Sequence, residues 1–305
     1  MKVATDTLSR RARGMLEGQA LPGYLEAHFA GSRDPYHPTR NPDGYIGLCV
    51  AENKLVADLV VDRLNRVREA PSSVLGYDAM TGSIRFREKL GAFMGRTFLG
   101  RVFAPEQISV LAGAGSVLEI LFHSIADPGD GVLVPTPSYA GFWMDLELRN
   151  RLKIVPVHTR AEEGFRLSPA LLDRAADEAD RPVKALLLTT PDNPLGRVYS
   201  ASELDEILGW AEGRGLHVVV DEIYALSVFG EREFTSCAKV RPSLGDRMHI
   251  VWAFSKDFGA SGLRCGVLVS ENEAVNAAVD ALAYWACCSG HTQFLLGELV
   301  SDEAW

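Results

Sequence analysis

The 305-residue sequence lacks several features that mark other classes of protein. It has no excess of basic residues: 31 Lys and Arg stand against 40 Asp and Glu, for a net charge of −9. That balance argues against nucleic acid or an anionic membrane as a partner. No apolar run approaches the ~20 residues of a membrane span, and Met1 to Arg13 contain no apolar core of signal-peptide length. We therefore expect a cytoplasmic protein that binds neither nucleic acid nor membrane.

Paired cysteines and clustered metal ligands are also missing. The five cysteines are odd in number and have no C-x-x-C spacing, so we expect reduced thiols. The seven histidines form no H-x-x-x-H pair, and no metal site is expected. Hydrophobic residues make up 47% and charged residues 23%, which is typical of a globular protein.

The first part of the chain is rich in helix-breaking residues. Residues 1 to about 50 contain several glycines and four prolines, Pro22, Pro35, Pro38 and Pro42. This composition predicts an irregular, extended N-terminal arm. Apolar positions from Leu55 to Val67 fall on one helical face, and a second helix is expected from Ile84 to Phe98.

After Phe98, short apolar runs alternate with helical stretches. The runs are 108–111, 131–134, 154–157, 185–189, 217–220, 250–253 and 267–269. They are apolar throughout, which is typical of strands covered by helices on both faces. Ser200 with Glu203 forms a capping box, and Ser168-Pro169 opens another helix. We expect an α/β three-layer sandwich with a mostly parallel central sheet.

A glycine-rich turn links the run 108–111 to a helix expected from Val117 to Ala126. Its sequence, Ala-Gly-Ala-Gly-Ser at 112–116, allows backbone N–H groups to approach an anion at a helix N-terminus. Strand–helix turns also use glycine for steric reasons alone, so both interpretations stay open. A dinucleotide-binding fingerprint would require a third glycine where Leu118 stands.

Two polar residues follow or end predicted strands, where open α/β sheets bind ligands. Asn193 could donate its amide to an anionic or phenolic oxygen, or it could form a turn before proline. Asp221 ends a strand of three valines, and a buried carboxylate requires a partner. A protonated nitrogen in a heterocyclic ligand would be such a partner, and Tyr224 could reach the adjacent oxygen of that ligand. The alternative is an acid that caps a helix.

Lys256 follows another buried run, between Phe254 and Phe258. These surroundings would partly desolvate its ammonium group and favour its use as a nucleophile and base. A surface lysine is the alternative interpretation.

The order of these features resembles the cofactor site of the class I aminotransferase superfamily. Members of this superfamily are fold type I enzymes that use pyridoxal 5′-phosphate (PLP). The resemblance extends from about Asn41 to Trp305. It implies that Lys256 carries PLP as a Schiff base and later moves the Cα proton. It also implies that Asp221 stabilises the protonated ring nitrogen, and that Tyr224 and Asn193 bind the phenolic oxygen.

The same resemblance implies further contacts to the cofactor. Tyr139 matches the aromatic residue that stacks on the ring. The expected phosphate ligands are Ala114, Gly115, Ser116, Ser255 and Arg264. Tyr77 matches a tyrosine that reaches the phosphate of the neighbouring subunit, which implies a homodimer with shared active sites.

Several segments resemble 1-aminocyclopropane-1-carboxylate (ACC) synthase in particular. They include Asn41-Pro-Asp-Gly-Tyr-Ile and Ala51-Glu-Asn-Lys54. Glu52 matches the acid near the α-amino and sulfonium groups of the substrate. The implied reaction converts S-adenosylmethionine into ACC and methylthioadenosine.

The sequence departs from the family pattern in two places. Ala253 stands where the family usually has a serine that binds the phosphate, and one such hydrogen bond is worth roughly 1.5–3 kcal/mol. The family also continues beyond the position of Trp305 with a segment that completes the small domain and binds the substrate carboxylate. We therefore assign 1–75 to an N-terminal arm and part of the small domain, 76–305 to the large PLP-binding domain, and expect the C-terminal part of the small domain to be absent.

Three other functions remain open at this point. The first is an aminotransferase or another PLP enzyme of β- or γ-elimination or replacement. The second is a non-catalytic relative, suggested by Ala253 and the end of the chain at Trp305. The third is an NAD-binding dehydrogenase, which the turn at Gly113 matches poorly.

Overall fold

A computed structural model describes residues 6–18, 23–67 and 69–304 of the chain. The chain divides into two units, Met1–Glu52 and Asn53–Trp305. The first unit contains two nine-residue helices, α1 (Arg10–Gly18) and α2 (Gly23–Gly31). The prediction of an irregular arm was therefore wrong for residues 10–18 and 23–31. Its prolines lie between or after the helices rather than within them, so they leave both helices intact.

The second unit is built around a seven-stranded sheet, with strand order β1-β7-β6-β5-β4-β2-β3. The strands are β1 (Ile108–Leu111), β2 (Gly131–Thr136), β3 (Lys153–His158), β4 (Val183–Thr189), β5 (His217–Asp221), β6 (Met248–Ala253) and β7 (Gly266–Ser270). Only β7 runs against its neighbours; the pairs β2·β3, β2·β4, β4·β5 and β5·β6 are parallel. The predicted mostly parallel sheet is confirmed, and each predicted run lies within a strand.

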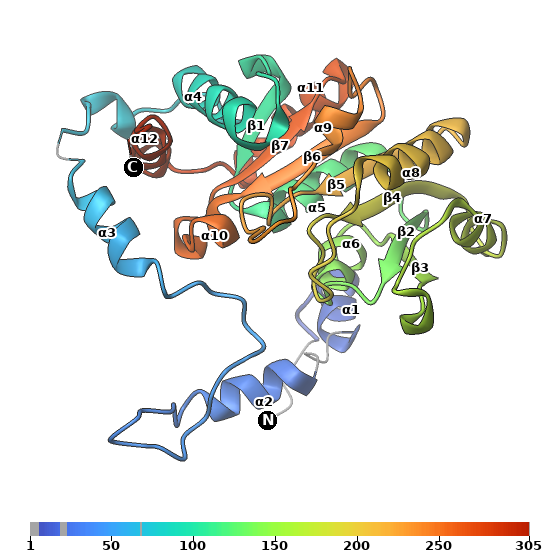
Figure 1. The fold of residues 1–305 in the computed structure, drawn as a ribbon, viewed down its shortest axis with the longest axis horizontal. Helices are drawn as coiled ribbons and strands as arrows, with labels where there is room; N and C mark the ends of the chain where they lie inside the picture. The colour runs from blue at the N-terminus through green and yellow to red at the C-terminus, as the bar shows by residue number, and fades with distance from the viewer. Residues whose placement is uncertain (1–5, 19–22, 68, 305) are drawn as a thin grey trace. The chain divides into compact units, whose positions relative to one another are not determined.

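Helices cover the sheet on both faces, so alternate residues of one strand enter different cores. In β4, Leu186 and Leu188 belong to one buried cluster, whereas Ala185 and Leu187 belong to the other. The first face carries α4 (Ile84–Met94), α7 (Pro169–Asp177), α8 (Ala201–Gly213), α9 (Cys237–Val240) and α12 (Gly290–Val300). The second carries α5 (Ala114–Ile125), α6 (Phe142–Glu147) and α11 (Glu273–Leu282). Figure 1 shows α8 and α5 on opposite sides of the sheet, which confirms the three-layer α/β class.

Local signals in the sequence fix several helix ends. The Ser200 hydroxyl accepts a hydrogen bond from Glu203 N at 3.3 Å, and the Glu203 carboxylate accepts one from Ser200 N at 2.9 Å. This confirms the predicted capping box. Helix α7 begins at Pro169, as expected from its fixed backbone angle. The helix predicted from Ile84 to Phe98 ends at Met94 and continues as a π-helical turn, Gly95–Leu99.

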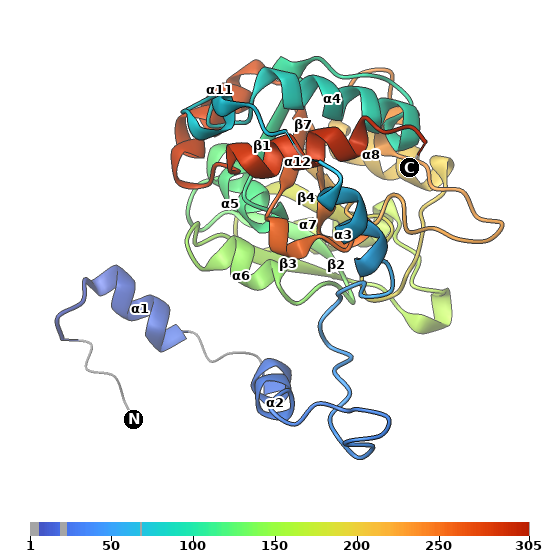
Figure 2. The same ribbon diagram turned by 90° about the vertical axis from the view of Figure 1, so that its left-hand side faces the viewer.

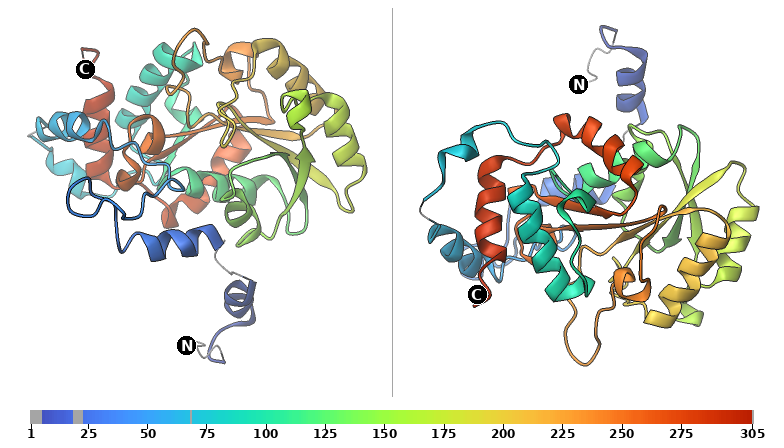
Figure 3. Two further views of the ribbon diagram at one scale, coloured as in Figure 1. Left: turned by 60° about the horizontal axis from the view of Figure 1, so that its bottom comes forward. Right: turned by 90° about the horizontal axis from the view of Figure 1, so that it is seen from above.

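Helix α12 packs against α4, against α3 (Ala57–Asn65) and against the 3-10 turn η1 (Ser72–Leu75), all from much earlier in the chain. Figures 2 and 3 show α4 and α12 side by side. Arg63 Nε lies 2.9 Å from Asp302 Oδ2, and Lys89 Nζ lies 2.5 Å from Glu298 Oε1.

Across the described segments, no helix has the length and apolar character needed to cross a membrane.

Candidate active site

Three neighbouring parallel strands end at one edge of the sheet. Asp221, the last residue of β5, lies opposite Thr189 of β4 and Val251 of β6. Strand β6 leads directly into α10 (Phe254–Asp257), which carries Lys256. Asp221 is 5% exposed and Lys256 is half-buried. The sheet thus brings an acid and an amine to the edge where α/β proteins bind ligands.

The electrostatics of this edge are dominated by the burial of Asp221. Burial raises the pKa of its carboxyl group to about 7. A hydrogen bond from Ile223 N–H, at 3.1 Å, and the charge of Lys256 lower the pKa, whereas Asp145 and Glu222 raise it. A cation placed beside Asp221 would favour its ionised form.

Asn193 and Tyr224 meet beside this acid. The Asn193 amide donates to Tyr224 Oη at 3.4 Å. Burial raises the pKa of Tyr224, the charge of Asp221 raises it further, and the hydrogen bond from Asn193 lowers it. Tyr139 also acts on the pKa of Tyr224, and its ring packs edge-to-face on Phe142 with centroids 5.3 Å apart. The structure therefore brings Asn193, Tyr224, Tyr139 and Asp221 to one place.

The glycine-rich turn lies at the N-terminus of α5, and its shape depends on close approaches of the backbone. Gly113 has φ +96°, and a Cβ there would stand 2.6 Å from Arg264 Nη2. A Cβ at Gly266 would stand 2.6 Å from Ala114 N. Arg264 donates to Ala112 O at 3.4 Å and to Ser261 O at 2.9 Å. A guanidinium and a helix N-terminus, whose first N–H groups have no partner within the helix, thus meet, as in anion sites.

The two serines among the predicted phosphate ligands differ in their surroundings. Ser116, in the first turn of α5, donates its hydroxyl to Ala112 O at 3.3 Å. Ser255, on α10 beside Lys256, is 8% exposed. Ala253 is fully buried at the N-cap of α10, where its side chain makes no capping hydrogen bond.

The sequence interpretation missed Asp257, which anchors the segment after β5 to the helix that carries Lys256. Its Oδ2 accepts hydrogen bonds from Trp252 Nε1 at 2.8 Å and from Leu226 N at 3.1 Å. Its Oδ1 accepts one from Ser227 Oγ at 2.7 Å. Its position in the sequence, directly after Lys256, was the signal that could have identified it.

Asp145 was also missed. It lies on α6, and its Oδ1 is 3.4 Å from where a Cβ at Gly115 would stand. Burial raises the pKa of Asp145 to about 6, and its charge acts on Asp221. Nothing in the sequence around it, Phe142-Trp-Met-Asp-Leu, distinguishes this acid from a surface residue.

Two other predicted residues have exposed side chains. Tyr77 follows η1 and is 98% exposed. Glu52 is an exposed residue of the first unit. The predicted role of Glu52 therefore rests on the sequence resemblance alone.

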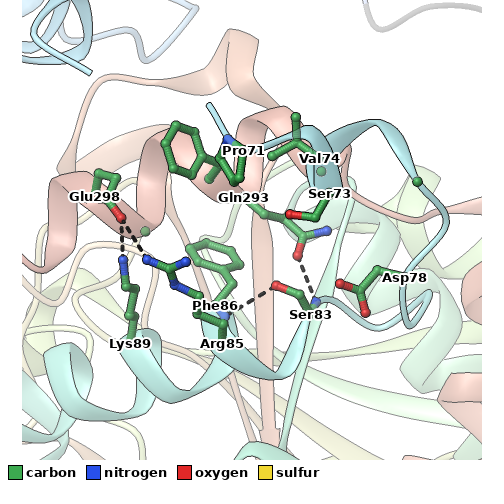
Figure 4. A pocket seen from close by; sticks show the side chains of 14 residues that line it. Pro71, Ser73, Val74, Asp78, Ser83, Arg85, Phe86, Lys89, Gln293 and Glu298 are labelled. Atoms are coloured by element: carbon green, nitrogen blue, oxygen red, sulfur yellow. Dashed lines mark hydrogen bonds and ion pairs between the residues drawn. The ribbon is translucent and has the colours of Figure 1, made fainter. Parts of the chain in front are cut away.

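A pocket of about 190 Å³ lies between η1, α4 and α12 (Figure 4). Three of its charged side chains interact with one another: Glu298 binds Lys89 at 2.5 Å and lies 3.7 Å from Arg85. Gln293 Oε1 accepts a hydrogen bond from Ser83 N at 2.8 Å. None of the predicted site residues lines this pocket. The candidate active site is therefore the edge of the sheet.

A family model, aminotransferase class I and II, matches residues 43–305. The chain is 35% identical to 1-aminocyclopropane-1-carboxylate synthase 1 of Cucurbita pepo over 97% of its length and 64% of the relative's. It is 37% identical to probable inactive 1-aminocyclopropane-1-carboxylate synthase-like protein 2 of Mus musculus, over 99% of its length and 54% of the relative's. The chain thus spans about half to two thirds of these relatives.

Among solved structures, the aspartate aminotransferase of Thermotoga maritima matches with a TM-score of 0.79 and 24% identity. The match covers 97% of this chain and 75% of that one. Aspartate aminotransferase of Thermus thermophilus in complex with maleate matches with a TM-score of 0.75 and 24% identity, over 97% and 73%. At this level of identity, the matches establish a common fold.

Proposed function

Because the chain belongs to the class I and II aminotransferase family, whose cofactor is pyridoxal 5′-phosphate, we propose that it is a PLP-dependent enzyme of the ACC synthase type. The proposed substrate is S-adenosylmethionine, and the products are ACC and methylthioadenosine. The observation that carries the proposal is the meeting of Lys256, Asp221 and the Asn193–Tyr224 pair at one edge of the sheet.

The side chains at this edge fit the cofactor chemically. The buried carboxyl group of Asp221, whose pKa is raised to about 7, suits a protonated ring nitrogen as its partner. The Asn193 amide and the Tyr224 hydroxyl suit the phenolic oxygen. The N-terminus of α5, with Arg264 beside it, suits a phosphate group. Ala114, Gly115, Ser116 and Ser255 complete the proposed phosphate ligands, and Tyr139 would lie against the ring.

Ala253 removes one hydroxyl from the usual phosphate set, and the surroundings explain why binding is still expected. Several donors remain, and the Arg264 guanidinium interacts with phosphate more strongly than a neutral hydroxyl does. Gly113 and Gly266 both permit the close backbone approach that brings Arg264 to the turn. We expect weaker binding than with a serine at position 253, but not its loss.

In the proposed mechanism, the bound cofactor supplies an electron sink for the electron pair of the broken Cα–H bond. Lys256 Nζ would take the Cα proton, and the Asp221 carboxylate would hold a proton on the ring nitrogen. Asp257 holds α10 against the segment after β5 and thereby keeps Lys256 at the site. In the overall reaction, a Cα–Cγ bond forms, the Cγ–S bond breaks, and the sulfonium sulfur receives its electron pair.

The substrate assignment draws on the curated relatives. ACC synthases of Cucurbita pepo and of Oryza sativa are 35% and 37% identical to this chain. On this basis we propose that Glu52 contacts the amino and sulfonium groups of the substrate. We also propose a cytoplasmic homodimer in which Tyr77, whose side chain is 98% exposed in the single chain, reaches the partner's site.

A non-catalytic relative is the second candidate function. It is favoured by the similarity to a mouse protein described as probably inactive and by Ala253. A PLP aminotransferase is the third candidate, and it is compatible with the family as a whole.

The test is to supply the chain and its Lys256→Ala variant with PLP and S-adenosylmethionine and to analyse the products by mass spectrometry. Methylthioadenosine with ACC, formed only by the wild type, would support the proposal. A keto acid with pyridoxamine phosphate would select the aminotransferase. PLP binding without turnover of either kind would select the non-catalytic relative.

A further inference from the structure

Asp257 joins three segments of the chain next to Lys256. It ends α10, and its carboxylate accepts hydrogen bonds from Trp252 of β6 and from Leu226 and Ser227 of the loop after β5. The three donor–acceptor distances are 2.8, 3.1 and 2.7 Å, which are normal for such bonds. The bonds from Leu226 and Ser227 connect the helix that carries the lysine with the turn that carries Tyr224.

The turn from Glu222 to Ser227 is closed by its own backbone. Ala225 N donates to Glu222 O at 2.9 Å, and Ser227 N donates to Tyr224 O at 2.9 Å. The Ser227 hydroxyl donates to Asp257 Oδ1. Ser227 thus binds Tyr224 through its backbone and Asp257 through its side chain, so a displacement of Asp257 would be passed on to Tyr224.

The other side of this anchor is an aromatic core. Trp252 and Phe254 are 0% exposed, and their ring centroids are 4.8 Å apart. Phe258 packs on both rings, with its centroid 6.1 Å from that of Trp252 and 5.1 Å from that of Phe254. Lys256 lies between the two phenylalanines in the sequence. The core that holds α10 therefore also holds the indole that donates to Asp257.

We propose that Asp257 is a positioning residue that holds the Tyr224 hydroxyl and the Lys256 amine in a fixed relation to each other. The inference rests on the proposed cofactor site, in which Lys256 forms an imine with PLP and Tyr224 binds the phenolic oxygen. The imine nitrogen and the phenolic oxygen of PLP are close enough in the cofactor itself to share a proton. The relation between the lysine and the tyrosine therefore determines how that proton is held.

The hydrogen bonds at Asp257 require acceptor atoms in the right places rather than a negative charge. Oδ2 accepts the N–H groups of Trp252 and Leu226, and Oδ1 accepts the Ser227 hydroxyl. An amide would preserve this pattern, because its oxygen can accept both N–H groups and its NH₂ group can donate to the hydroxyl oxygen. Asp257→Asn should therefore keep the anchor. Asp257→Leu has a similar shape but removes the three hydrogen bonds.

The first test is the pH at which the visible absorbance of PLP on the full chain changes, as the imine nitrogen loses its proton. A hydrogen bond from Tyr224 to the phenolic oxygen makes the shared proton easier to lose, because it stabilises the negative charge that remains. Asp257→Leu should displace Tyr224 and raise the midpoint by about one pH unit, the equivalent of one hydrogen bond. Ser227→Ala should give a smaller rise, and Asp257→Asn should keep the wild-type midpoint.

A double variant separates positioning from a general loosening of the fold. Tyr224→Phe removes the hydroxyl and should raise the midpoint by itself. If Asp257 acts through Tyr224, Asp257→Leu combined with Tyr224→Phe should raise it no further than Tyr224→Phe alone. Two rises that add would overturn the proposal, and so would a wild-type midpoint in Asp257→Leu.

Asp173→Leu is the matched control. Asp173 also accepts an indole N–H, from Trp210 Nε1 at 2.8 Å, but it lies on α7. The control variant should lose stability and keep the wild-type midpoint. A rise as large as that of Asp257→Leu would overturn the proposal, because it would indicate an effect of stability alone.

The anchor can also be measured without cofactor, which separates this inference from the proposed function. In the cofactor-free chain, the Leu226 amide should exchange faster in Asp257→Leu than in the wild type or in Asp173→Leu, as followed by hydrogen-exchange mass spectrometry. Unchanged exchange would overturn the proposal. A wild-type chain that binds no PLP would instead overturn the proposed function, and this inference with it, even where the exchange rates differ as expected.

Discussion

The guanidinium group of Arg264 lies directly over Gly113, so that a Cβ at position 113 would stand 2.6 Å from Arg264 Nη2. Gly113 also has φ +96°, a conformation that other residues adopt with strain. The residue therefore serves two purposes: it turns the chain into α5, and it leaves space for a cation at the N-terminus of the helix.

Gly113→Ala should displace Arg264 and weaken PLP binding at least tenfold, in addition to destabilising the fold by about 1–3 kcal/mol. Gly129→Ala is a matched control, because Gly129 has the same φ of +96° and nothing within 4 Å of its Cβ position. It should lose stability but keep its affinity for PLP. Denaturant unfolding and PLP titration of both variants provide the test, and equal affinities would contradict the role given to Gly113.

Asp221 should make the cofactor-free chain less stable as the pH rises. The pKa of its carboxyl group is about 7 in the folded chain and ~3.9 when unfolded. Between these values the folded state binds more protons, so this contribution is fully present below pH ~4 and is lost as the pH rises to 7. The stability of Asp221→Asn relative to the wild type should rise by up to about 1.4 kcal/mol per pH unit from pH 5 to 7.

Urea unfolding of the cofactor-free chains at several pH values measures this difference. Asp62→Asn, at an exposed position, is the control and should give no such slope. The same Asp221→Asn variant should bind PLP much more weakly and lose most turnover, because the ring nitrogen has lost its partner. A flat difference between pH 5 and 7 would mean that Asp221 is not buried as described.

A second buried group gives the opposite pH dependence. His249, on β6, is fully buried and contacts His217 at 3.0 Å and Ser270 Oγ at 2.9 Å. Burial, and then the charge of His217, lower the pKa of His249 to about 3. Below its unfolded pKa of ~6.5 the unfolded state binds more protons, so the stability from this group is present above that pH and is lost as the pH falls toward 3.

The wild type should therefore lose stability relative to His249→Gln between pH 6.5 and 5, by up to about 1.4 kcal/mol per pH unit. Above pH 7 the difference should be constant. His291→Gln, at an exposed position, is the control. Unfolding curves that give the same slope for both variants would contradict the buried state of His249.

Much of the fold could be predicted from the sequence because parallel strands covered on both faces are apolar throughout. Each of the seven predicted runs lies within a strand, and the capping box at Ser200 begins α8. The helices α1 and α2 were missed because both contain glycines and because prolines lie between and after them. The π-helical turn after Met94 depends on local packing, since a Cβ at Gly95 would approach Arg101 O to 2.9 Å.

The site was predictable where chemistry follows a strand and hidden where it depends on packing between helices. Asp221, Asn193 and Lys256 stand at or just after strand ends, so their positions in the sequence indicate their meeting. Asp145 reaches the site only because α6 packs on α5, which no spacing in the sequence reveals.

The central claim is that Lys256 is the residue that carries PLP. The most direct measurement is to load the full chain with PLP, fix the cofactor to its lysine with borohydride, and identify the labelled peptide by mass spectrometry. We predict a phosphopyridoxyl group on Lys256 alone among the seven lysines. Labelling of any other lysine in its place, or no labelling, would contradict the account.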